Sequence, residues 1–283
     1  MRIDGQEESS NIEDRRGQRS RMPGGKGGGI IGLIILLVGA YYGVDLSGVV
    51  GTGDLSGSSS AQTSTLDSQQ EAHLRKLAGV TLGSTEKVWS SYFAQHNAQY
   101  KPTTMVLYTG GTSTACGTGQ AAMGPFYCPG DQKIYLDLSF YEDMKNKLGA
   151  AGDAAFAYVI AHEVGHHIQN LTGTLPKVHQ AQQNAQSQAQ ANALSVKLEL
   201  QADCYAGIWA KNAKDQNIFE AGDAELAISA AESVGDDRLQ KRSQGYAVPD
   251  SFTHGSSEQR MQWFQRGFNS GDIKQCNTFA GTV

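Results

Sequence analysis

The chain has 283 residues, enough for one large domain or two small ones. Its formal net charge is -5, its pI is near 5.8 and charged residues make up 18% of it. There is no extended basic face and no run of Lys and Arg interleaved with aromatic residues, so we expect no nucleic-acid partner.

The first 29 residues are polar, rich in glycine and poor in aromatic residues, which predicts a disordered arm over residues 1–29. A basic cluster with no acid between its members lies in the arm and comprises Arg15, Arg16, Arg19, Arg21 and Lys26. We therefore interpret this stretch as a basic arm in front of whatever folds downstream.

An uncharged apolar run follows, from Ile30 to Val44. It is short for a helix that spans a bilayer, which needs about 20 residues. The flanking glycines and the interfacial pair Tyr41 and Tyr42 can extend it, and we predict an uncleaved anchor over residues 30–47. A signal peptide is the alternative, but the arm is long and no small-x-small cleavage site follows. A buried core helix fits the polar flanks poorly.

Charges on the two sides of this run predict its orientation. The basic cluster precedes it, whereas the next charges are acidic, from Asp45 to Glu71. By the positive-inside rule the N-terminus stays in the cytoplasm and the rest is exported, which describes a single-pass protein of the cell membrane. Residues 48–69 are rich in Gly, Ser and Thr and predict a flexible linker. The folded domain is then expected over residues 70–283, outside the cytoplasm or in the periplasm.

The start of this domain combines helical and extended patterns. The predicted elements are helices at 71–77 and 86–93, a strand at 103–108, an extended piece at 125–128, a strand at 133–140 and a helix at 141–148. Apolar and polar residues alternate in the segment 133–140, as in a strand with one buried face. Such a strand can border a cleft and pair with an extended substrate, although an ordinary core strand fits equally well.

The central motif is His-Glu-x-x-His, which begins at His162 and lies in a predicted helix over residues 153–172. In a helix, His162 and His166 lie on one face, one turn apart, so both can bind one Zn²⁺. Glu163 can then take a proton from water on the metal. Gly165, between the histidines, would let a neighbouring chain approach closely. By itself the motif also occurs by chance in unrelated proteins.

A second helix, predicted over residues 194–211, offers the third protein ligand that such a site needs. Glu199 and Asp203 are four residues apart and therefore share one face of it. We predict that Glu199 binds the metal and that Asp203 accepts a hydrogen bond from the far nitrogen of a ligand histidine. The alternative is a surface Glu beside an unrelated Asp, which the apolar neighbours disfavour.

The remaining segments carry less information. Residues 176–193 are polar and rich in Gln and Ala, so they form either a solvated helix or a mobile flap. Residues 223–233 read as a helix, and Ser256 with Gln259 predicts a capping box at the start of another.

Four cysteines suggest two disulfides in an exported domain. Three pairings are possible, and the spacing favours Cys116 with Cys128 and Cys204 with Cys276. A zinc site made of the four cysteines is disfavoured because the chain has no Cys-x-x-Cys.

A hydrolase of this kind also needs a hydrogen-bond donor for the developing oxyanion. His254 lies in a Gly/Ser loop of the type that lines clefts, and we predict that it is this donor, with Arg260 orienting the loop. Tyr246 is the substitute donor. A loop histidine that only caps or packs is the alternative.

These residues also carry a resemblance to known families. His162-Glu163-x-x-His166 followed by Glu199-x-x-Ala202-Asp203 resembles the gluzincin arrangement of two His and one Glu. It is also similar to membrane-bound metalloproteases of the heat-shock and CAAX-processing type. Their Thr-His…Arg segment is echoed here from Thr253 to Arg260, with Gly255 in place of the usual proline.

Over nearly its whole length, the chain resembles the bacterial family described as putative neutral zinc metallopeptidases. The resemblance includes the basic arm, the apolar run, the Gly-Pro-Phe-Tyr-Cys-Pro box at 124–129, both metal motifs and the His-Gly-Ser-Ser-x-Gln-Arg end. It implies an α+β, zincin-like domain with a small sheet and active-site helices behind a transmembrane helix.

The expected function is a membrane-anchored zinc endopeptidase acting on peptides or proteins outside the cytoplasm. A zinc-stabilised binding or scaffold domain that cleaves nothing is the alternative. The oligomeric state cannot be predicted from these patterns.

Overall fold

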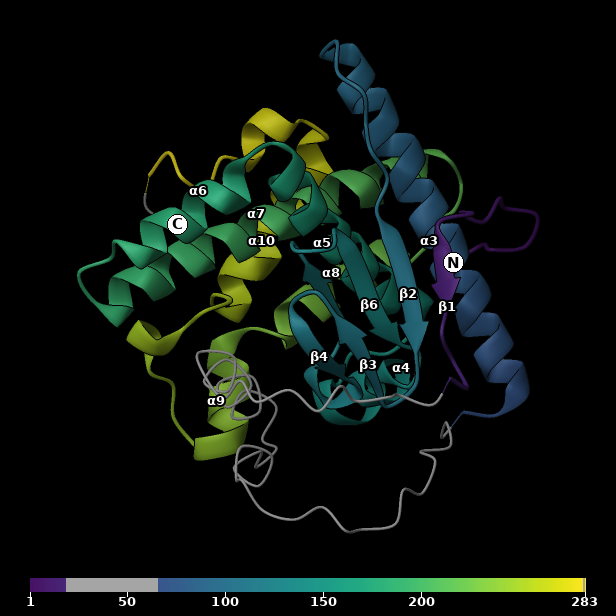
Figure 1. Ribbon diagram of the computed structural model, residues 1–283, viewed down its shortest axis with the longest axis horizontal. Coiled ribbons are helices and arrows are strands. Elements are labelled where there is room, and N and C mark those ends of the chain that lie inside the picture. The colour runs from purple at the N-terminus through teal and green to yellow at the C-terminus, as the bar shows by residue number, and fades with distance from the viewer. Residues whose placement is uncertain (19–65, 282) are drawn as a thin grey trace.

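The computed structural model describes residues 1–18, 66–281 and 283 (Figure 1). Within these ranges no helix is both long enough and apolar enough to cross a membrane. The anchor predicted at residues 30–47 and most of the linker predicted at residues 48–69 lie outside the described residues.

A four-stranded mixed sheet forms one layer of the domain. Its strand order is β1 (Ile12–Asp14), β2 (Thr104–Tyr108), β6 (Lys133–Asp137) and β5 (Phe126–Cys128). The pairs β1–β2 and β2–β6 are parallel, whereas β5 runs antiparallel to β6. The strand predicted at 133–140 is therefore an interior strand. The alternative of an ordinary core strand is confirmed, and pairing of this strand with a substrate is wrong. Among the described residues, β5 is the sheet edge on that side.

A hairpin of β3 (Gly111–Thr114) and β4 (Gly117–Gln120) extends from the sheet. The disulfide Cys116–Cys128 ties its turn to β5, which confirms the predicted pairing. The hairpin was not predicted, because its short strands consist of Gly, Thr, Ser and Gln and lack apolar alternation.

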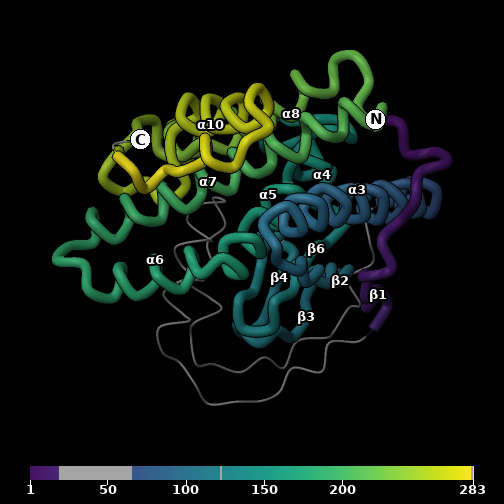
Figure 2. Tube along the Cα trace, turned by 90° about the horizontal axis from the view of Figure 1, so that it is seen from above, coloured from purple at the N-terminus to yellow at the C-terminus, as the bar shows by residue number. Residues whose placement is uncertain are grey.

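Helices make up the rest of the domain (Figure 2). The helices are α3 (Ser68–Gln95), α4 (Phe140–Asp143), α5 (Asp153–Leu171), α6 (Thr174–Gln183), α7 (Gln188–Asp215), α8 (Asp223–Ser233), α9 (Asp236–Gln244) and α10 (Ser257–Ser270). Single turns form at Ala121–Met123, Met144–Leu148, Pro249–Ser251 and Ile273–Cys276. Helices α3 and α5 lie side by side against the sheet, and α7, α8 and α10 pack on the far side of α5. A mixed α+β domain with a small sheet, as predicted, is confirmed.

Small residues set the closest helix contact. A Cβ atom on Gly267 of α10 would lie 1.9 Å from the Cys204 carbonyl oxygen of α7, and one on Gly207 would lie 2.1 Å from the Phe264 oxygen. The two backbones therefore touch where these helices cross. The disulfide Cys204–Cys276 joins α7 to the turn Ile273–Cys276 that follows α10. It confirms the second predicted pairing.

The capping box predicted for α10 is present, with Ser256 and Gln259 satisfying each other's backbone N–H groups. The polar stretch at 176–193 is helical except at residues 184–187, since it forms most of α6 and the start of α7. Gln182 joins these helices through bonds to the Ala191 oxygen and the Ser195 hydroxyl.

Residues 1–18, here called the docked segment, are part of the fold (Figure 1). They supply strand β1 and bury Ile3 and Ser9 against the domain. The prediction of disorder over residues 1–29 is therefore wrong for residues 1–18. The prediction relied on composition alone. A polar segment can nevertheless be ordered when its backbone and charges bind a distant part of the chain.

Candidate metal centre

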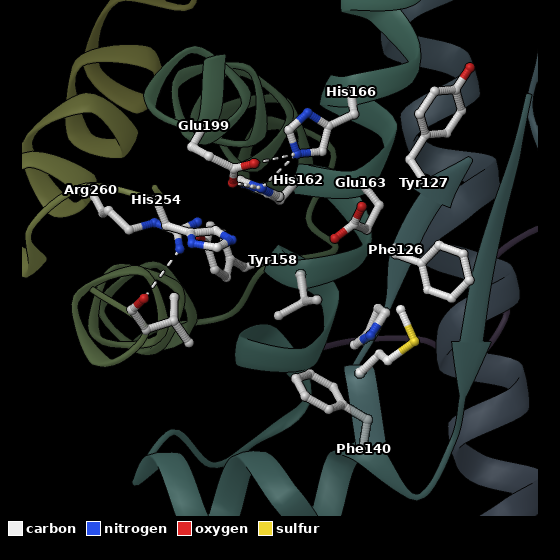
Figure 3. Close-up of a pocket in the computed structure, with 14 residues that line it drawn as sticks. Phe126, Tyr127, Phe140, Tyr158, His162, Glu163, His166, Glu199, His254 and Arg260 are labelled. Atoms are coloured by element: carbon white, nitrogen blue, oxygen red, sulfur yellow. Dashed lines mark hydrogen bonds and ion pairs between the residues drawn. The ribbon is translucent and has the colours of Figure 1, made fainter. Parts of the chain in front are cut away.

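Three predicted metal ligands converge on one point (Figure 3). His162 and His166 come from consecutive turns of α5, and Glu199 reaches them from α7. The two Nε2 atoms are 3.1 Å apart. Glu199 Oε2 lies 3.0 Å from His162 Nε2, and its Oε1 lies 3.3 Å from His166 Nε2. These side chains can hold a metal ion together.

The contact between α5 and α7 depends on Gly165. A Cβ atom there would lie 3.1 Å from both the Cα and the carbonyl oxygen of Ala202. The close approach predicted for this glycine is confirmed, and it brings Glu199 within reach of the histidines.

The far nitrogens of both histidines are also occupied. His162 Nδ1 lies 2.8 Å from Asp203 Oδ1, as predicted for Asp203. His166 Nδ1 lies 2.9 Å from Gln169 Oε1, a contact that was not predicted. Gln169 donates from Nε2 to the Leu198 oxygen, which leaves its Oε1 to accept from the ring. Both Nδ1 atoms therefore donate, and both Nε2 lone pairs face the centre.

This donor set fits a zinc ion. Two lone pairs and a carboxylate that face one another at about 3 Å repel unless a proton or a metal ion lies among them. Ligands about 2.0 Å from a tetrahedral Zn²⁺ are about 3.3 Å apart, close to the separations of 3.0 to 3.3 Å found here.

The same residues have shifted pKa values in the metal-free protein. Burial opposes a charge on His162, but the carboxylates of Asp203 and Glu199 outweigh it and raise the pKa of His162 to about 10. Burial would raise the pKa of Glu199, yet the two histidines hold it well below its ordinary value. The site therefore attracts a cation strongly.

Asp203 belongs to a buried polar network beneath the histidines. Arg260 donates from Nε to Asp203 Oδ2 at 2.8 Å and from Nη2 to Oδ1 at 3.0 Å. Tyr158 donates its hydroxyl hydrogen to Asp203 Oδ1 at 2.6 Å. The side chain of Arg260 also binds Tyr158 and the Val234 oxygen, and it supports His162 through Asp203. Its role in orienting the His254 loop stays a prediction.

Asp236 holds the loop that carries His254. Its Oδ2 accepts from the backbone N–H groups of Thr253, His254 and Gly255 at 2.9, 2.7 and 3.0 Å. Its Oδ1 lies 3.5 Å from His254 Nδ1. Gly255 has φ +94°, and its N–H donates, so proline fits neither the angle nor the bond. This explains the departure from Thr-His-Pro.

A pocket of about 280 Å³ contains the site and has two chemically different ends. The polar end holds the metal ligands, His254 and Arg260. The apolar lining comprises Met123, Pro125, Phe126, Phe140 and Val159, and Figure 3 shows Phe126 and Phe140 on the side away from the metal ligands. Figure 3 shows the Glu163 carboxylate between the two ends. Tyr246 is 62% exposed and is not part of this lining.

Glu163 is a buried carboxylate at the junction of these ends. Burial raises its pKa above the ordinary value, while the charges of His166 and His162 oppose the shift. A carboxylate whose pKa is moved toward neutrality is a better proton acceptor and donor near pH 7.

Sequence patterns found the metal ligands, Glu163 and Asp203, and missed other residues that support them. Tyr158, Gln169 and Asp236 carry no motif of their own, and their partners lie up to 102 positions away. One signal was available for Gln169, since it lies three residues after His166 and thus on the same helical face.

The chain is similar to proteins of Escherichia coli and Mycobacterium tuberculosis. The chain is 52% identical over 292 residues to "Uncharacterized protein YpfJ" of Escherichia coli strain K12, which covers 100% of both chains. It is 37% identical over 211 residues to "Uncharacterized protein Rv2575" of Mycobacterium tuberculosis strain H37Rv, which covers 71% of this chain and 69% of the relative. No solved structure matches it.

The family profile described as "Putative neutral zinc metallopeptidase" matches residues 1–279, which include the docked segment and the metal centre. A family of this description implies Zn²⁺ as the metal that the two histidines and Glu199 would bind. The chain belongs to the family of putative neutral zinc metallopeptidases.

Proposed function

We propose that the protein is a zinc-dependent endopeptidase. One observation carries this proposal. The Nε2 atoms of His162 and His166 and the carboxylate of Glu199 lie together beside the buried Glu163. Family membership supports the same reaction class.

Each side chain then has a task in peptide-bond hydrolysis. A bound Zn²⁺ would polarise the scissile carbonyl and acidify a water molecule. Glu163 takes a proton from the attacking water and passes it to the leaving amine. His254 lines the same pocket on a loop that Asp236 holds, and we propose that it donates to the developing oxyanion. Asp203 and Gln169 keep the ligand histidines in the required tautomer.

The two ends of the pocket favour a particular substrate. The polar end suits the peptide group that reacts, and the apolar end suits a large uncharged side chain next to it. Strand β5, an edge of the sheet with Phe126 and Tyr127 in the pocket wall, can pair with an extended peptide. We propose peptides or proteins with an apolar residue beside the scissile bond.

We further propose that the protein acts outside the cytoplasm and attaches to a membrane. Both disulfides support an oxidising compartment, since such bonds are rare in the cytosol. Membrane attachment rests on the apolar run of residues 30–44 in the sequence.

The decisive experiment compares the wild type with Glu163→Gln, which removes the base and keeps the metal ligands. Terminal peptides of exported proteins are quantified in cells that carry either form, and zinc is measured in both purified proteins. We expect about one zinc per chain in each, as one tetrahedral site implies, and new termini only with the wild type. A wild type that holds zinc and generates no new termini would favour the scaffold alternative.

A further inference from the structure

The docked segment has a dedicated position in the sheet. Strand β1 pairs in parallel with β2, with Ile12 beside Met105 and Asp14 beside Leu107. Met105 donates to the Asn11 oxygen at 2.9 Å, and Arg15 donates to the Leu107 oxygen at 2.7 Å. The backbone of the segment thus completes hydrogen bonding along β2 that would otherwise remain open.

Helix α3 is shaped to receive the residues before β1. A Cβ atom on Gly83 would lie 3.1 Å from both the Glu7 oxygen and the Ser9 nitrogen. Ser9 also donates its N–H to the Gly79 oxygen at 2.9 Å. The side chains of Ser9 and Asn11 both donate to Glu86, at 2.6 and 2.8 Å. Gly79 and Gly83 therefore form the surface of α3 on which the docked segment lies, here called the glycine seat.

Charges on the segment and on the domain are complementary. The ion pairs between them include five along the segment, which join Glu13 to Lys133, Arg16 to Glu71, Asp4 to Lys76, Glu8 to Arg75 and Glu7 to Lys87. A single exposed ion pair contributes little to stability. Here five of them accompany strand pairing and a fitted glycine seat, so docking uses three independent kinds of contact.

We propose that the docked segment and the metal centre occupy the same compartment. One crossing by the apolar run would leave Gln18 and Leu66 on opposite faces of a hydrocarbon layer about 30 Å thick. The docked segment would then lie across the bilayer from its seat. Docking and a single-pass anchor are mutually exclusive in this chain.

The docked segment also weakens the charge argument for a cytoplasmic N-terminus. Arg15 donates to Glu13, Thr112 and the Ser113 oxygen, and Arg16 donates to Asp14 and Glu71. These two arginines belong to the folded domain and do not act as free positive charges beside a membrane. The positive-inside rule counts basic residues near the ends of a span. Two of the five basic residues on which the prediction relied are therefore no longer available to it.

The test places one new cysteine on each part of the full-length chain. All four native cysteines are in disulfides, so Ser10→Cys and Gln216→Cys, both at exposed positions, supply single free thiols. Sealed bacterial spheroplasts that carry each variant are treated with a membrane-impermeant maleimide before and after detergent. We expect the two thiols to respond alike, both labelled before detergent or both only after it. One thiol labelled before detergent and the other only after it would overturn the proposal.

A second measurement tests docking itself. The Gly83→Leu variant fills the seat, so trypsin should cut after Arg15 or Arg16 at least ten times faster in that variant than in the wild type. Ala98→Leu, at an exposed position outside the seat, is the matched control and should keep the wild-type rate. Equal cleavage rates in the wild type and in Gly83→Leu would show that the segment is not docked, and the proposal would fail.

Discussion

The carboxylate of Asp203 and the guanidinium of Arg260 form a bidentate pair beneath the metal centre, with N–O distances of 2.8 and 3.0 Å. Both side chains are at most 5% exposed, so neither charge has water to replace its partner. The pair holds Asp203 at a fixed position, from which it accepts the Nδ1 hydrogen of His162. The position of a ligand histidine thus depends on a residue of α10, 98 positions after it in the chain.

Asp203→Asn should weaken zinc binding without removing it. The amide oxygen can still accept from His162, but the loss of charge lowers the basicity of the ring, so we expect zinc affinity to fall about 10-fold to 100-fold. Competition with a zinc chelator measures the affinity. Asp215→Asn, on the exposed C-terminal end of the same helix, is the control and should bind zinc as the wild type does. Unchanged affinity in Asp203→Asn would separate Asp203 from the metal site.

Zinc binding should release protons at neutral pH. The pKa of His162 is about 10 in the metal-free protein, so His162 is charged at pH 7, whereas a ligand histidine must be neutral. We expect about one proton released per zinc at pH 7, and a zinc affinity that rises about tenfold per pH unit while that proton is displaced. Calorimetry in two buffers of different ionisation enthalpy counts the protons, and a count of zero would contradict this prediction.

The same raised pKa predicts how the metal-free protein responds to pH. A histidine with a raised folded-state pKa stabilises the fold below its ordinary pKa, and this stabilisation is lost as the pH rises through the folded value. The contribution of His162 should therefore disappear as the pH approaches about 10. Thermal melting of the metal-free wild type against that of Asp203→Asn, across this range, measures the contribution.

Substitution of His254 should reduce kcat alone, whereas substitution of Asp236 should reduce both kcat and stability. His254→Ala should keep zinc and stability but lose on the order of a hundredfold in kcat, because an oxyanion donor is absent. Asp236→Ala should lose kcat and also stability, since three backbone N–H groups lose their acceptor at about 1 kcal/mol or more each. Asp250→Ala, an exposed carboxylate nearby, is the control. Wild-type kcat in His254→Ala would remove His254 from the mechanism.

The apolar end of the pocket should set substrate preference. Met123→Lys places a charge among Pro125, Phe126 and Phe140, so it should reduce kcat/KM for peptides with Leu or Phe beside the scissile bond by about tenfold or more. Met123→Leu keeps the volume and polarity and should retain the preference. Peptide libraries read by mass spectrometry measure both. A Met123→Lys enzyme with wild-type selectivity would exclude this end as the specificity site.

The sequence by itself determined the features that short-range geometry controls. Positions four apart in a helix share a face, which is why His162 with His166 and Glu199 with Asp203 were predicted from spacing. The capping box of Ser256 and Gln259 and the helix at 223–233 follow from the same local rules. Cys128 follows Cys116 by only twelve positions, which favoured their pairing.

Only the tertiary structure decided what depends on partners far along the chain. Tyr158 and Asp236 became part of the site because folding brought Arg260 and the backbone N–H groups of residues 253–255 to them, and no local pattern marks either residue. The docked segment is the clearest case. Its polar composition is typical of disorder, yet β2 and the glycines of α3 supply the hydrogen bonds and the space that order it. Composition measures what a segment can bury by itself, whereas its order here depends on contacts that only the folded chain provides.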